Sequence, residues 1–71
     1  MTREQVRSSN LRSVGYLAAT ETLEVEFRSG AVWRYHNVPR GVAEGLRAAA
    51  SPGQFFVDHI RRQYTGERVS G

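Results

Sequence analysis

The chain has 71 residues, of which ten are basic, seven are acidic and none is cysteine, and its net charge is +3 at pH 7. A chain of this length forms one small domain that buries only about 60% of its unfolded surface. The lack of cysteine excludes disulfides and thiolate metal sites and favours an intracellular protein. The N-terminal segment has no apolar signal region, and no run reaches the ~18 apolar residues of a membrane span. We therefore expect one cytoplasmic domain over residues 1–71 with no membrane contact.

The first predicted element is a strand at residues 13–18, where Val14 and Tyr16 fall on one side of a period-two alternation. This alternation is the pattern of a half-buried strand. The short polar side chains at residues 8–10, Ser-Ser-Asn, bond readily to nearby backbone and predict a turn before the strand. Antiparallel pairing with the next strand would place Tyr16 beside Leu23.

A β-hairpin is predicted over residues 23–36, because two alternating runs flank Ser29 and Gly30. A two-residue loop would pair Phe27 with Val32 and mix apolar and charged groups on each face. A type I turn followed by Gly30 in a left-handed bulge makes one face wholly apolar instead. This bulged register gives three apolar pairs: Leu23 with Tyr35, Val25 with Trp33, and Phe27 with Ala31. A slip of one residue would destroy the pattern, so the bulged register is our prediction.

The period then becomes helical near Pro39, whose fixed φ and missing N–H suit the first turn of a helix capped by Asn37 or Val38. The apolar face of this helix is made by Val42, Leu46 and Ala49. Gly45 lies next to that face, and its missing side chain would allow a close approach to the sheet.

A second helix is predicted from Ser51, since Pro52 at the first helical position and Gln54 at the third match a capping box. Its apolar stripe follows a spacing of four and consists of Phe56, Ile60 and Tyr64. Gly66 is expected to end this helix.

Together these elements predict an α+β domain, a three-stranded antiparallel meander followed by two helices packed on one face. The domain core would span residues 6–64, with residues 1–5 and 66–71 as flexible ends. The other sheet face is expected to be exposed, with Glu24 opposite Arg34 as a cross-strand ion pair. That face would carry Glu24, Glu26, Arg28, Val32, Arg34 and His36, with Ser13, Gly15 and Leu17 alongside.

The segments VRSSNLRSVGY, LEVEF, SGAVWRY, a Val-Pro and ASPGQFFVDHIRRQY, in this order, resemble the KTSC domain family. The resemblance covers residues 6–64. This family consists of small modules found alone in bacterial and phage proteins and at the C-terminus of some lysyl-tRNA synthetases. The family's central strand carries a Tyr-x-Tyr pair, which here reads Trp33-Arg34-Tyr35. The synthetase fusion implies RNA binding, and the family implies no established activity.

Arginine is the main candidate for ligand contact, because all ten basic residues are arginine and its planar guanidinium matches phosphates and bases. A GC-rich coding sequence would also produce this composition. The arginines that we select as nucleic-acid contacts are Arg7, Arg12, Arg34, Arg61 and Arg62. Trp33 and Tyr35 could stack on bases. The predicted register places both rings on the core face, where they would pack or reach the rim.

Catalysis is not expected, because no serine has a His and Asp at a spacing that would activate it. His36 and His59 are far apart and have no Cys or carboxylate partner at ligand spacing, so neither a metal nor another cofactor is expected. Two functions remain open. One is an accessory module for RNA or another nucleic acid, and the other is a protein-interaction module or small homo-oligomer that uses a sheet face or strand edge.

Overall fold

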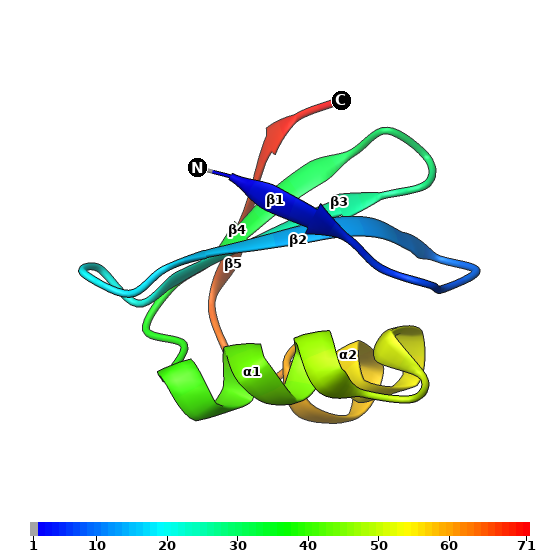
Figure 1. Cartoon of the computed structure of the whole chain (residues 1–71). Helices are drawn as coiled ribbons and strands as arrows, with labels where there is room; N and C mark the ends of the chain where they lie inside the picture. The colour runs from blue at the N-terminus through cyan, green and yellow to red at the C-terminus, as the bar shows by residue number, and fades with distance from the viewer. Residues whose placement is uncertain (1) are drawn as a thin grey trace.

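The structure is a computed structural model that describes residues 2–71. It contains one five-stranded antiparallel sheet and two helices that cover one face of it (Figure 1). The elements in chain order are β1 (Arg3–Gln5), β2 (Leu11–Leu17), β3 (Thr22–Phe27), β4 (Val32–Tyr35), α1 (Arg40–Ala48), α2 (Pro52–His59) and β5 (Gly66–Ser70). Among these residues no helix is long and apolar enough to span a membrane.

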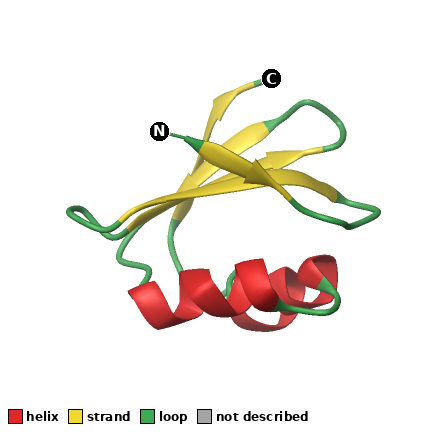
Figure 2. Ribbon diagram, in the orientation of Figure 1, coloured by secondary structure: helices red, strands yellow, loops and turns green. Residues whose placement is uncertain are grey.

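The sheet order is β1-β2-β3-β4-β5, so strands that are consecutive in the chain are neighbours in the sheet. Figure 2 shows the sheet as one layer and the helices as the other. The α+β class and the meander are confirmed, and the predicted count of three strands is wrong. The two further strands come from the end segments expected to be flexible, and β1 and β5 form the edges of the sheet.

The bulged register of the hairpin is confirmed. Leu23 pairs with Tyr35, and Val25 pairs with Trp33. The Phe27 N–H donates to the Ala31 carbonyl at 2.9 Å, and Gly30 has a φ of +98°. A positive φ of this kind is the conformation for which glycine carries no side-chain penalty.

The predicted first strand is also confirmed, and Tyr16 pairs with Leu23. The polar turn before it is formed by Ser8, whose Oγ accepts hydrogen bonds from the N–H groups of Asn10 and Leu11 at 3.1 and 3.2 Å. The core then forms between the sheet and the helices from Leu11, Leu23, Val25, Leu46, Ile60 and other buried residues.

The helix boundaries differ from the predicted ones. Pro39 is itself the N-terminal cap of α1, because its ψ of 152° is still extended while its carbonyl accepts from Val42 and Ala43. The close approach at Gly45 is made with the Phe55 ring of α2 rather than with the sheet, since a Cβ would lie 2.7 Å from Phe55 Cζ.

The second helix begins after Ser51 as predicted, but Ser51 makes no side-chain cap. Gln54 instead donates to Asp58 at 2.9 Å. The helix ends at His59, not near Gly66, because the Phe56 carbonyl accepts from both Ile60 and Arg61 and turns the chain. Residues 60–63 continue as a turn, and Gly66 begins β5.

The sheet face away from the helices was predicted to be exposed, and at its centre this is wrong. Glu24, Ser13 and Val32 are buried there. Glu24 is covered by Arg3 of β1 at 3.4 Å and by Arg34 of β4 at 2.9 Å. The burial therefore depends partly on β1, a strand that the sequence did not predict.

Candidate nucleic-acid interface

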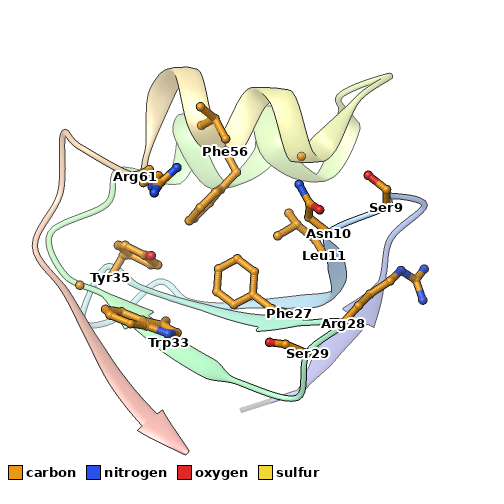
Figure 3. A pocket seen from close by; sticks show the side chains of 13 residues that line it. Ser9, Asn10, Leu11, Phe27, Arg28, Ser29, Trp33, Tyr35, Phe56 and Arg61 are labelled. Atoms are coloured by element: carbon orange, nitrogen blue, oxygen red, sulfur yellow. The ribbon is translucent and has the colours of Figure 1, made fainter. Parts of the chain in front are cut away.

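A groove of about 720 Å³ lies between α2 and the sheet, at the end nearest the β3–β4 turn (Figure 3). Its apolar walls are made by Leu11, Phe27, Trp33, Tyr35, Phe56 and Val57. Its polar and small lining residues are Ser9, Asn10, Arg28, Ser29, Arg61, Gly53 and Gly66. The volume falls in the range of about 300–1,000 Å³ that is typical of small-molecule sites.

The aromatic walls form one connected cluster. Trp33 and Tyr35 are two residues apart on β4, so both point to the helix-covered face, and their rings stack with centroids 6.3 Å apart. Phe56 reaches down from α2 and meets Tyr35 edge-on at 5.4 Å and Phe27 edge-on at 5.5 Å. Tyr35 is buried and Trp33 is only half-buried, so the indole ring is the more accessible of the two.

Two glycines allow the walls of the groove to approach one another. Gly66 pairs with Tyr35, and a Cβ on Gly66 would overlap the Tyr35 ring. A Cβ on Gly53, in the first turn of α2, would lie 2.9 Å from Ser8 Oγ. The turn at residues 8–10 therefore comes close to the start of α2, at the end of the groove where Arg28 lies.

The groove is positively charged. Arg61 and Arg28 lie at opposite ends of it in Figure 3, and none of its described lining residues is acidic. Arg28 is held in place because its Nε donates to the Ser8 carbonyl at 2.7 Å. Burial raises the pKa of the Tyr35 hydroxyl, and the nearby Arg61 charge partly opposes that rise. A ligand with negative charge would therefore be favoured here.

The structure brings together three of the residues that the sequence selected, namely Trp33, Tyr35 and Arg61, all of which line the groove. Arg62 follows Arg61 in the turn after α2 and is exposed. Both arginines lie beyond the helix rather than within it, because α2 ends at His59 and does not extend toward Gly66 as predicted.

The other selected arginines lie elsewhere. Arg7 is exposed in the connection from β1 to β2, and Arg12 is exposed at a bulge in β2. Arg34 lies on the opposite sheet face and is bound to Glu24. Within residues 2–71 ion pairs engage Arg3, Arg34 and Arg47, and the other seven arginines have no Asp or Glu partner, although Arg68 donates to the Gly71 oxygen.

Sequence reasoning did not select Arg28 or Asn10 as site residues. Both were assigned elsewhere, Arg28 to the exposed sheet face and Asn10 to a turn. A polar turn before a strand and an arginine in a hairpin turn are each common, so neither residue alone gave a signal. Only the pairing of Leu11 with Phe27 brings the two turns to the same end of the sheet.

A second cavity of about 350 Å³ lies between β1, β2 and α1. Its charges are mixed, because Arg47 donates to Glu44 at 2.8 Å and to Glu4 at 3.2 Å. These carboxylates raise the pKa of Arg47 further above its ordinary value. Groups of three or more potential metal ligands are absent from residues 2–71.

Comparison with known proteins identifies the class of this domain. The KTSC domain model matches residues 7–64. A crystal structure of a KTSC domain protein from Yersinia pestis superposes with a TM-score of 0.94 at 29% identity and covers 97% of both chains. The chain therefore belongs to the KTSC domain family, and the resemblance drawn from its sequence is confirmed.

Two further relatives differ in length. A protein of Stutzerimonas stutzeri, described as uncharacterized, is 44% identical over 64 residues, which is 90% of each chain. A lysine–tRNA ligase of a Nostoc species is 39% identical over 62 residues. That match covers 87% of this chain but only 11% of the ligase, so the chain corresponds to a small part of that enzyme.

Proposed function

We propose that this chain is a non-enzymatic module that binds RNA through exposed arginine side chains. The observation that carries the proposal is the groove in which Arg61 and Arg28 flank Trp33 and Tyr35 with no acidic residue in the lining. RNA-binding modules use this combination, in which arginines contact phosphates and aromatic rings contact bases.

The wider charge distribution supports the same function. Seven arginines form no ion pair with an Asp or Glu of the described chain, and four of them, Arg7, Arg12, Arg61 and Arg62, are among the contacts selected from the sequence. An arginine without an intramolecular partner can bind a phosphate without first losing an ion pair. The Nostoc relative, a lysine–tRNA ligase, adds a link of context to tRNA.

The direct test is a fluorescence-anisotropy titration of the domain into labelled tRNA and into unstructured RNA, at about 50 and 200 mM salt. We expect micromolar or tighter binding that weakens steeply with salt, because each phosphate contact releases condensed counterions. Absence of binding at the lower salt concentration would contradict the proposal.

A charge reversal locates the contact surface. The double substitution Arg61→Glu and Arg62→Glu should weaken binding by about tenfold or more and lower the salt slope by about one for each lost contact. The matched comparison is Arg61→Glu alone against Arg40→Glu on α1, because both arginines are exposed, neither pairs with an Asp or Glu of the described chain, and both substitutions change the net charge equally. Unaltered affinity in the double variant would exclude this patch, and equal losses in the two single variants would mean that only net charge matters.

A protein-interaction function is the second candidate, and the edge strand β5 favours it. This strand pairs with β4 on one side only in the described sheet, and its Val69 side chain is exposed. An unpaired strand edge can add a strand from another chain. Binding of a partner protein to the open sheet face is less favoured, because Val32 on that face is buried. Sedimentation that detects a dimer, with no RNA affinity at low salt, would favour this second function.

A further inference from the structure

We infer that the groove between α2 and the sheet binds an unpaired nucleobase of single-stranded RNA, held against Trp33, with phosphates on either side contacted by Arg61 and Arg28. This inference rests on the proposed function and names the part of the RNA that the groove recognises. It goes beyond phosphate contact, because it assigns an interaction with the base itself.

The shape and lining of the groove fit a flat, apolar ring. Its apolar lining is one aromatic cluster, in which Tyr35 of β4 touches Phe56 of α2 and stacks beside Trp33. Trp33 keeps part of its ring accessible, since it is half-buried. Base stacking on aromatic side chains is the usual way in which proteins hold single-stranded RNA.

The charges at the two ends distinguish a nucleotide from a peptide. A nucleotide within a chain carries a phosphate on each side of its base, and the groove places Arg61 at one end and Arg28 at the other (Figure 3). An aromatic residue of a peptide would carry neutral backbone on both sides. With no acidic side chain in the lining, nothing in the described groove offsets these two cations.

The enclosure of the groove favours an unpaired base over a duplex. Its sides are a strand and a helix, and the turn at residues 8–10 borders it near Gly53. A base in a duplex has both faces covered by its neighbours, so it could not enter this space without leaving the stack. Single strands, loops and bulges present such bases without that cost.

The test compares a short single-stranded RNA with an oligonucleotide of the same length whose bases have been removed. Both carry the same phosphates, so they differ only in the bases. We expect the intact RNA to bind about 5- to 100-fold more tightly. Trp33 is the one tryptophan of the chain, so its fluorescence reports directly on the groove, and intact RNA should quench it while the abasic strand should not.

A pair of variants locates the effect. Val57 lines the groove and Leu17 does not, and both are exposed apolar residues, at 42% and 47%. The substitutions Val57→Glu and Leu17→Glu change the net charge equally. Val57→Glu should abolish most of the difference between intact and abasic RNA, whereas Leu17→Glu should retain it.

The outcomes separate this inference from the proposed function. Equal, salt-sensitive affinity for both strands with unchanged Trp33 fluorescence would overturn the base site while RNA binding stands. Absence of binding to either strand at low salt would overturn both. Quenching of Trp33 by a neutral aromatic peptide, with no effect of RNA, would make the groove a protein-binding site and would also overturn the inference.

Discussion

Glu24 has a role that its position in the sequence does not reveal. It lies on the sheet face away from the helices, yet it is only 7% exposed and binds Arg3 and Arg34. Arg3 pairs with Gly15, and Gly15 pairs with Glu24, so these residues form one row across β1, β2 and β3. Because Gly15 has no side chain, Arg3 can reach over it to the carboxylate.

Replacing Glu24 should therefore destabilise the domain. The substitution Glu24→Gln keeps the shape but removes the charge between two arginines, and we expect a loss of about 1–3 kcal/mol in the free energy of unfolding. The control is Glu44→Gln, where an exposed carboxylate pairs with Arg47 and a much smaller loss is expected. Urea unfolding of both variants measures the difference, and equal losses would show that Glu24 is not a structural centre of the sheet.

The strands and helices differ in how far the sequence predicts them. The hairpin register could be predicted because one pairing satisfies both faces, with Val25 opposite Trp33 and Glu24 opposite Arg34. The edge strands β1 and β5 could not be predicted in this way. Their sequences are Arg-Glu-Gln and Gly-Glu-Arg-Val-Ser, most of these residues are exposed, and backbone pairing rather than an apolar pattern holds them.

The C-terminal end of α2 could not be predicted from the apolar pattern either. Tyr64 still packs against the core, and its N–H donates to the Ile60 carbonyl, so the spacing of four continues through a turn that is not helical. Trp33, Tyr35 and Arg61 could be selected as site residues from their chemistry. These three residues share a groove because α2 ends at His59 and because the turn at residues 8–10 lies near Gly53. No local sequence pattern predicts either feature.

Two glycines in different elements should respond to alanine in opposite ways. Gly66→Ala would push a methyl group into the Tyr35 ring, and we expect a loss of about 1–3 kcal/mol from overpacking. Gly41 lies in α1 with no atom within 4 Å of an added Cβ, so Gly41→Ala should raise stability by about 0.5–1 kcal/mol through helix propensity. Thermal unfolding of both variants measures these changes, and we expect a lower melting temperature for Gly66→Ala and a higher one for Gly41→Ala. Stabilisation by Gly66→Ala would contradict the close packing of β5 on Tyr35.

The composition of the whole chain makes its alkaline titration unusually simple. It has no lysine and no cysteine, so tyrosine is the side chain that titrates as the pH passes 10. Burial raises the pKa of Tyr35 above its ordinary value of 10.0, with Arg61 opposing. Burial also raises that of Tyr16, with Glu21 adding to the rise and Arg40 opposing it.

These raised values predict that the folded state loses stability in alkali. The neutral hydroxyls are favoured by folding, so their contribution is fully present below the unfolded pKa of 10.0 and is lost as the pH rises through the folded values. Urea unfolding from neutral to alkaline pH, followed together with tyrosinate absorbance, should show this decline. Tyr35→Phe should reduce it. A stability that rises above pH 10 would contradict the predicted direction.

The strand order also bears on how the molecule folds. The first four strands are joined by short connections, so their pairings form between residues that are near in the sequence. Both helices lie between β4 and β5, so β5 can reach its place only after a much longer segment has been closed into a loop. Long-range closure slows folding more than local pairing does. The rate at which the last strand docks should therefore depend on how readily α1 and α2 form and bring the chain back to the sheet.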